Sequence, residues 1–127
     1  MAIAKLGVTA LDCPDPAALA AFYAALVGGE VVDPEEDDWV EVEGPDGERR
    51  LAFQRVEGYQ PPSWPGQEQP QQLHLDFDVP RAEIDEAERQ VLALGAKLAW
   101  GDEGERNFRV YLDPAGHPFC LCMTDRA

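Results

Sequence analysis

Serine, phosphate-binding glycines and basic side chains are scarce in this sequence, and each shortage excludes a class of function. Ser63 is the only serine, so no serine nucleophile with a histidine and an aspartate can be read from the chain. The stretch "GPDGE", residues 44–48, lacks the lysine and the following helix that a phosphate-binding loop needs. Serine hydrolysis and phosphoryl transfer are therefore unsupported.

Positive charge is outnumbered: 10 lysines and arginines stand against 25 acidic residues, for a formal net charge of −15. Such a chain repels phosphate backbones and anionic lipids, and it attracts cations. No apolar run reaches the roughly 18–20 residues of a membrane span, and the start lacks the pattern of a secretory signal. Three cysteines are too few for a disulfide scaffold. We expect a cytoplasmic protein that binds neither nucleic acid nor membrane.

A helix is predicted directly after the first strand, which we place in residues 2–12. The helix "DPAALAAFYAALVGG" has Asp15 as its N-cap and Pro16 in its first turn, and it ends at Gly28. Its apolar residues at helical spacing predict a buried stripe made of Ala18, Phe22, Ala25 and Leu26.

The order of one strand, one helix and three strands is predicted twice. The first copy spans residues 1–56 and the second spans residues 71–127. Between them lies a connector, residues 57–70, whose four prolines exclude a helix or an internal strand. The pattern D-x-P at residues 12–14 returns 66 positions later, at residues 78–80. This repetition indicates an internal duplication.

These features together resemble the vicinal oxygen chelate superfamily, in particular its small glyoxalase-like and bleomycin-resistance-like domains. The motifs that carry the resemblance are the two D-x-P patterns, "AFYAALVGGEVV", "HLDFDV" and "DPAGHPF". The resemblance implies a single α+β domain over residues 1–127. In such a domain two tandem βαβββ modules form a curled mixed-sheet cup around the site. It also implies a homodimer.

The stretch "QLHLDFDV", residues 72–79, alternates between apolar and polar side chains, which in a strand point to opposite faces. The apolar set should pack on a second helix, predicted over residues 81–96, through the stripe Ile84, Ala87, Val91 and Leu92. The polar set should face the cup, because unpaired charges in the core would each cost several kcal/mol. That set consists of Gln72, His74, Asp76 and Asp78.

The resemblance also indicates where metal-dependent members of the superfamily place their ligands. Val8 occupies the first of these places and has no lone pair to donate. The remaining candidates are Gln54, His74 and Cys120, a set without a carboxylate that suits Zn²⁺ better than Fe²⁺, Mn²⁺ or Mg²⁺. We therefore expect no catalytic metal. The alternative is a divalent metal, for which Asp76 could supply an oxygen ligand.

The function that these arguments favour is metal-free binding of a small molecule that is apolar, aromatic or cationic. Trp64, in the connector, could close the site as a lid or cover a sheet edge. The alternative is an enzyme, a lyase, isomerase or dioxygenase with altered metal ligands or with His74 as general base. A purely structural role is the third. The residues expected to contact the ligand are Val8, Trp39, Phe53, Gln54, Trp64, Gln72, His74, Asp76, Tyr111 and Cys120.

Overall fold

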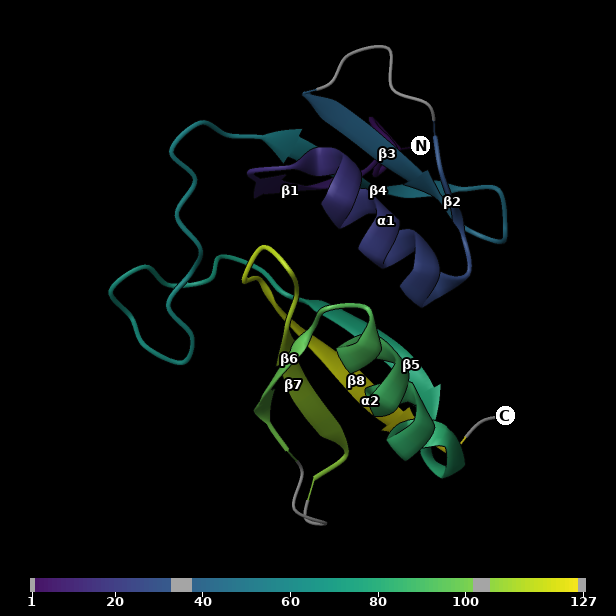
Figure 1. Cartoon of the computed structure of the whole chain (residues 1–127). Coiled ribbons are helices and arrows are strands. Elements are labelled where there is room, and N and C mark those ends of the chain that lie inside the picture. Colours follow the sequence, from purple (N-terminus) through teal and green to yellow (C-terminus); the bar gives the residue numbers. More distant parts are fainter. Residues whose placement is uncertain (1, 33–37, 102–105, 126–127) are drawn as a thin grey trace. The chain divides into compact units, whose positions relative to one another are not determined.

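The structure, a computed structural model, describes residues 2–32, 38–101 and 106–125 (Figure 1). The chain divides into two compact units, residues 1–59 and residues 60–127. Each unit contains an α-helix and a four-stranded sheet within its described residues. The twofold repetition predicted from the sequence is confirmed. No helix among the described residues is both long enough and apolar enough to span a bilayer.

Unit 1 follows the predicted order of elements. Its elements are β1 (Thr9–Cys13), α1 (Pro16–Val27), β2 (Glu30–Val31), β3 (Trp39–Glu43) and β4 (Arg49–Arg55). The predicted first strand, residues 2–12, is too long at its start, because residues 2–8 have no strand partner. The acidic stretch of residues 34–38 is predicted from the sequence to be a turn, and most of it lies outside the described residues.

Unit 2 repeats this order, with a 3₁₀ turn before its α-helix. Its elements are β5 (Leu75–Pro80), η1 (Arg81–Glu83), α2 (Ile84–Ala93), β6 (Lys97–Trp100), β7 (Phe108–Leu112) and β8 (Pro118–Thr124). The strand predicted from Gln72 begins at Leu75. In the predicted helix over residues 81–96, the first three residues form a 3₁₀ turn and the α-helix ends at Ala93.

The two sheets have the same topology. Their strand orders are β1-β4-β3-β2 and β5-β8-β7-β6, and in each sheet the first strand pairs in parallel with the last strand of its unit. Thr9 pairs with Leu51, and Leu75 pairs with Phe119. The pairing of residues, and not only their order along the chain, is therefore repeated.

The ends of α1 are those that the sequence predicts. The Asp15 side chain accepts a hydrogen bond from the Ala18 backbone N–H at 3.3 Å, which caps the first turn. Gly28 takes the left-handed conformation, with φ 71°, at the other end. The predicted buried stripe is partly wrong, because Ala18 and Ala25 are exposed. The helix is apolar nearly all round, so the sequence has no polar face to set its orientation. The residues buried in α1 are Pro16, Leu19, Ala20, Phe22, Tyr23 and Ala24.

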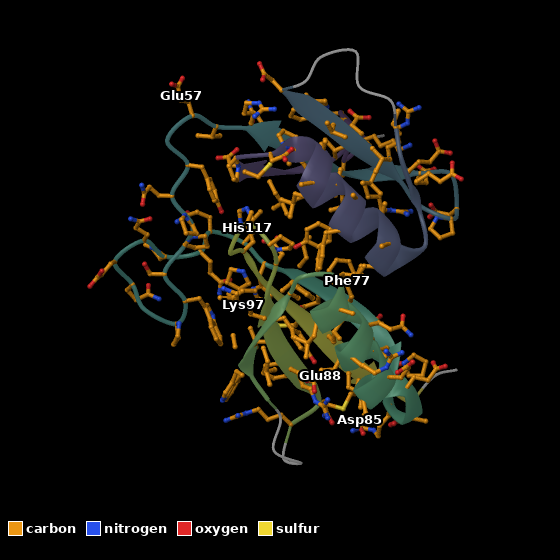
Figure 2. All side chains as sticks on the ribbon, in the orientation of Figure 1. Glu57, Phe77, Asp85, Glu88, Lys97 and His117 are labelled. Carbon is orange, nitrogen blue, oxygen red and sulfur yellow. The ribbon has the colours of Figure 1, made fainter. Side chains whose placement is uncertain are left out.

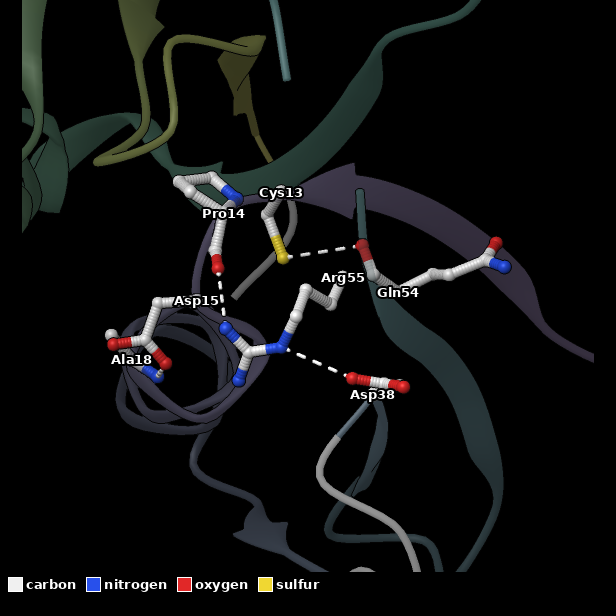
Figure 3. A network of polar contacts seen from close by, with 7 residues as sticks. All are labelled: Cys13, Pro14, Asp15, Ala18, Asp38, Gln54 and Arg55. Carbon is white, nitrogen blue, oxygen red and sulfur yellow. Dashed lines mark hydrogen bonds and ion pairs between the residues drawn. The ribbon is translucent and has the colours of Figure 1, made fainter. Parts of the chain in front are cut away.

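A polar network joins the start of α1 to the ends of β3 and β4 in unit 1 (Figure 3). The Arg55 guanidinium donates to the Asp38 carboxylate at 3.1 Å and to the Pro14 carbonyl at 3.0 Å. The Cys13 thiol donates to the backbone carbonyl of Gln54 at 3.6 Å. These contacts fix the end of β4, where Gln54 lies.

Side-chain contacts between helix and sheet identify the face of each sheet that packs on its helix. In unit 1, Tyr23 of α1 stacks on Phe53 of β4 with centroids 5.5 Å apart. In unit 2, the Tyr111 hydroxyl donates to Glu88 of α2 at 2.8 Å. Because successive strand residues point to opposite faces, the neighbours of Phe53 and Tyr111 point away from the helices. We call this second face of each sheet its helix-free face.

We predict that Gly29→Ala destabilises unit 1 at a close approach of two backbone segments. A Cβ on Gly29 would lie 2.3 Å from the Glu43 carbonyl oxygen, so the chain between α1 and β2 would have to move. Overpacking of this kind costs about 1–3 kcal/mol. Urea unfolding should show a lower midpoint. The control is Gly7→Ala, because a Cβ there meets nothing within 4 Å; equal midpoints for the two variants would contradict the prediction.

Candidate functional site

Three side chains with different ligand atoms meet on the helix-free face of unit 2. Asp76 of β5 pairs in register with Cys120 of β8, and His74 lies two residues before Asp76, just outside the strand. The His74 Nε2 atom is 3.2 Å from the Asp76 Oδ1 atom. One ligand atom from each of the three residues lies within 4.8 Å of the other two. His74 and Asp76 are exposed, whereas Cys120 is buried. We call these residues the His-Asp-Cys cluster.

The thiols on this face are neutral. Burial raises the pKa of Cys120 to about 12, and the neighbouring Asp76 carboxylate raises it further through its charge and a hydrogen bond. Burial, together with the charges of Asp76 and Asp78, also raises the pKa of Cys122. A thiolate is the reactive form of cysteine. Neither residue therefore has the environment of a nucleophile.

The corresponding positions in unit 1 carry no ligand atoms in their side chains. Ala10 of β1 pairs with Ala52 of β4, as Asp76 pairs with Cys120 in unit 2. Val8 precedes Ala10 by two residues, as His74 precedes Asp76. The two copies of the sheet therefore differ in chemistry at the same place.

Strand pairing determines which face of the sheet carries Gln54, one of the residues expected to contact a ligand. Gln54 follows Phe53, which packs on α1, so Gln54 lies on the helix-free face of unit 1. Its register partner Trp39 shares that face, and the Trp39 Nε1 group donates to Glu41 at 2.9 Å. Gln54 and Trp39 therefore lie on the face expected of ligand contacts.

Phe53 and Tyr111, by contrast, are core residues. Both rings are fully buried, and strand alternation prevents Phe53 from sharing a face with Gln54. Tyr111 is held by α2, where Figure 2 marks Asp85 and Glu88. The Arg109 guanidinium lies 3.3 Å from Glu88 and 3.0 Å from Asp85. Our proposal for the ligand site therefore does not include these two aromatic residues.

A group of aromatic side chains lies at the other edge of the sheet in unit 2. Trp64 of the connector lies 6.4 Å from Trp100 of β6, measured between ring centroids, and Trp100 lies 5.7 Å from Phe108. The Arg106 guanidinium lies 3.5 Å above the centre of the Trp100 ring. Trp100 pairs with Val110, which pairs with Cys120, so the aromatic group shares the helix-free face with the His-Asp-Cys cluster. Trp64 packs over the edge strand β6.

Trp100 is outside the set of residues that we expected to contact a ligand. Strand β6 is short, and its pairing with β7 shifts between Leu98 and Trp100. Because of this shift, counting alternate residues along β6 does not tell which face of the sheet carries the Trp100 side chain. The stretch "KLAWG", residues 97–101, is predicted from the sequence to be a strand. The position of Trp100 in that strand was the available indication of its role.

The remaining polar candidates lie in turns and connectors. Gln72 is exposed, and its amide N–H donates to the Pro70 carbonyl at 3.5 Å. Its neighbour Gln71 has a buried side-chain oxygen without a hydrogen-bond partner among the described residues. His117 belongs to the turn between β7 and β8, where its backbone N–H donates to the Asp113 carboxylate at 3.0 Å. The stretch "PAGHP", residues 114–118, is predicted from the sequence to be a turn, which agrees with this placement.

An open groove occurs in unit 1, lined by residues from the start of the chain and from the start of β4. Its lining includes Lys5, Thr9, Arg49 and Arg50. The two arginines are already paired, Arg49 with Glu41 and Glu43 and Arg50 with Asp46. Nothing in this groove assembles an acid, a base or a set of metal ligands. We give more weight to the chemistry of the helix-free face of unit 2.

Comparison with known proteins places this arrangement in a family. The model of the glyoxalase-like domain family matches residues 8–122, and the chain belongs to that family. The expected membership of the vicinal oxygen chelate superfamily, with its two tandem βαβββ modules, is thereby confirmed. A search of curated proteins found no match.

Solved structures with the same fold come from proteins of several activities. A glyoxalase/bleomycin resistance/dioxygenase family enzyme from Burkholderia phytofirmans is 21% identical, with a TM-score of 0.71, over 93% of this chain and 97% of that one. A fosfomycin resistance protein from Listeria monocytogenes is 19% identical, with a TM-score of 0.71, over 97% and 93%. The oxidase ChaP-H2 is 24% identical, with a TM-score of 0.64, over 97% and 95%. At these identities the likeness shows the fold alone.

The superfamily includes metal-dependent members, so the fit of a metal to the His-Asp-Cys cluster must be tested on its donor atoms. The cluster offers one nitrogen, one carboxylate oxygen and one sulfur within 4.8 Å. Such a set suits a borderline-soft ion such as Zn²⁺ and does not suit ions that require mostly oxygen ligands. Our expectation of no catalytic metal rested first on Val8, which has no lone pair to donate, and second on a ligand set without a carboxylate. The next observation concerns only the second ground. The structure removes that premise, because Asp76 joins His74 and Cys120.

We predict that Tyr111 makes stability depend on alkaline pH. Burial, and then the hydrogen bond and charge of Glu88, raise the pKa of Tyr111 above its ordinary value of about 10. A raised pKa means that the neutral phenol stabilises the fold fully below pH ~10, and that this contribution is lost as the pH rises from there toward the folded-state pKa. Tyr111→Phe should cost about 1–2 kcal/mol at neutral pH through the lost hydrogen bond.

The measurement is urea unfolding of both proteins between neutral pH and pH ~11. The free energy of unfolding of the native protein should fall more steeply above pH ~10 than that of Tyr111→Phe. Parallel curves for the two proteins would show that Tyr111 does not titrate differently in the folded state.

Proposed function

We propose that the chain binds a small molecule on the helix-free face of unit 2. The observation that carries this proposal is the shared facing of two groups of side chains. The His-Asp-Cys cluster lies at the β5–β8 side and the Trp100 aromatic group lies at the β6 side. A polar end and an aromatic end on one surface are typical of small-molecule sites. The proposal needs no metal for organic binding.

The charge of this face favours a cationic ligand. Asp76 and Asp78 place two carboxylates on neighbouring positions of the same face, while the thiols beside them stay protonated. Among residues 2–32, 38–101 and 106–125, no lysine or arginine forms an ion pair with Asp76 or Asp78. A ligand ammonium group would therefore meet uncompensated negative charge. An anionic ligand would be repelled unless a metal ion lay between.

The aromatic end supports the same ligand class. Arg106 lies over the Trp100 ring, and this contact supports the proposal that the ring binds a cation or a flat π-system. The strands of a sheet lie about 4.8 Å apart, so the three steps from β5 to β6 span about 14 Å. A molecule that contacts both ends must carry its aromatic group and its ammonium group on a linker of several atoms.

We predict that dansylcadaverine, an aromatic ring system linked to a primary amine, binds this face. Energy transfer from the tryptophans of unit 2 to the dansyl group should increase to saturation as the probe is added. The acetylated probe, which has lost its charge, should bind about tenfold more weakly or worse, because a charge-assisted hydrogen bond contributes about 1.5–3 kcal/mol.

Variants distinguish binding at this face from nonspecific attraction of the probe to an acidic protein. Asp76→Asn combined with Asp78→Asn should weaken dansylcadaverine binding, and Trp100→Leu should reduce both binding and energy transfer. Glu83→Gln is the control, since Glu83 is an exposed acid in η1, outside the strands. Equal affinities for the native protein and the Asp76/Asp78 double variant would reject this face as the site.

A second candidate function is catalysis, favoured by the contact between His74 and Asp76. The 3.2 Å separation of Nε2 and Oδ1 lets the carboxylate orient the imidazole, as in acid–base pairs of enzymes. His74 would then act as general base toward a proton next to a carbonyl group. An NMR screen of carbonyl compounds in D₂O would detect catalysed exchange of that proton. Exchange that persists in His74→Gln would remove this role.

We also propose that the protein is a cytoplasmic homodimer. The outer strands β2 and β6, together with β1 and β5, leave sheet edges within each unit, and unpaired edges favour association with another chain. Light scattering during size-exclusion chromatography measures the mass directly. A mass of one chain across the working concentration range would refute the dimer.

A further inference from the structure

We propose that Arg106 competes with the ligand for the ring of Trp100. The Arg106 guanidinium lies 3.5 Å above the centre of that ring, at the end of the surface where the aromatic group of the ligand is proposed to bind. A ligand group must therefore displace this side chain before it can stack on the ring. This inference rests on the binding function proposed above, and it identifies a residue that limits affinity and selects the ligand.

The Arg106 side chain covers one face of the Trp100 ring. Arg106 is exposed, whereas Trp100 is only partly accessible, so the arginine lies on the solvent side of the ring. Two aromatic neighbours meet Trp100 at an angle, with ring planes 65° apart for Phe108 and 54° apart for Trp64. Neither of them stacks flat on it. Among the described residues, the guanidinium is therefore the planar group that occupies the place of a stacked ligand.

The contact is weak enough for a ligand to displace it. A cation over an aromatic ring at an exposed site stabilises a structure only slightly, and a long arginine side chain loses rotamer freedom when it stays there. Such contacts correspond to a stacking equilibrium constant of about 2 to 5, so the ring is free in about a sixth to a third of the molecules. The apparent affinity for a ligand falls by that same fraction.

This competition determines which chemical groups can bind the ring. Guanidinium is planar and more weakly hydrated than an ammonium group, so an alkylammonium is the weaker competitor for Trp100. A flat aromatic ring system is the stronger one, because it removes a larger apolar area from water. The ligand class is therefore an extended aromatic group with an amine on a linker, whose ring system displaces Arg106 and whose ammonium group lies at Asp76 and Asp78.

The first experiment measures dansylcadaverine affinity for the native chain, for Arg106→Gln and for Lys97→Gln. Lys97, marked in Figure 2, is exposed and pairs with Leu112 of β7. Leu112 follows Tyr111, which contacts α2, so Lys97 lies on the helix-free face. Each variant removes one positive charge, but only Arg106→Gln uncovers the ring. Lys97→Gln is therefore the matched control for charge.

We expect Arg106→Gln to bind dansylcadaverine about three- to sixfold more tightly than Lys97→Gln, since this factor is the reciprocal of the fraction of free ring. Equal affinities for the two variants would overturn the proposal, because charge alone would then explain any gain over the native chain. Weaker binding by Arg106→Gln than by the native chain would also overturn it, because Arg106 would then support the ligand.

The second experiment tests the contact without a ligand, by acrylamide quenching of tryptophan fluorescence. Acrylamide is neutral, so its collisions with a ring depend on exposure and not on charge. The contribution of Trp100 is the difference between each protein and the same protein with Trp100→Leu. Quenching of this contribution should be stronger in Arg106→Gln than in the native chain, and Lys97→Gln should match the native chain. Equal quenching in all three proteins would overturn the proposal.

Together the two experiments distinguish failure of the competition from failure of the proposed function. Dansylcadaverine binding with equal affinity in Arg106→Gln and Lys97→Gln would keep the proposed function and reject the competition. Stronger quenching in Arg106→Gln, with no dansylcadaverine binding by any of the three proteins, would confirm that Arg106 covers the ring and reject the proposed ligand class.

Discussion

The parallel pairing of β5 with β8 is the constraint on which the site depends. Its register sets Asp76 beside Cys120 and Asp78 beside Cys122, and strand alternation turns these residues away from α2. The same register places Leu75 beside Phe119 on the helix side, where Phe119 stacks with Tyr111 at 5.5 Å. A shift of one residue would bury the carboxylates against the helix, at several kcal/mol for each unpaired charge. Core packing and site chemistry therefore enforce the same register.

The duplication explains why one fold carries two different surfaces. Both units pair their first and last strands in the same way, so the core of each sheet follows one plan. The helix-free faces have diverged, with alanines in unit 1 where unit 2 has Asp76 and Cys120. Side chains on that face do not pack on a helix, so their chemistry can differ while the helix contacts of each unit stay the same.

Much of this could be predicted from the sequence, and the failures have physical causes. Caps and alternation are local, so Asp15, Gly28 and the facing of Asp76 followed from the chain itself. The buried face of α1 could not be predicted, because a helix that is apolar on all sides has no polar face to indicate which side packs on the sheet. Phe53 was expected to contact a ligand but lies in the core. The sequence of one strand does not reveal which of its two faces packs on the helix. Trp100 was left out of the expected ligand contacts because the pairing of β6 with β7 shifts beside it. Asp76 was expected as a possible oxygen ligand, because it shares a strand face with His74.

The central claim is that one histidine, one carboxylate and one thiol of unit 2 form a single site. The most direct measurement is the crystal structure of the chain grown with dansylcadaverine. The account predicts the ammonium group of the probe beside Asp76 and its ring system beside Trp100, with the His74 and Cys120 side chains on the same face. A probe bound elsewhere, or a Cys120 side chain turned toward α2, would contradict it.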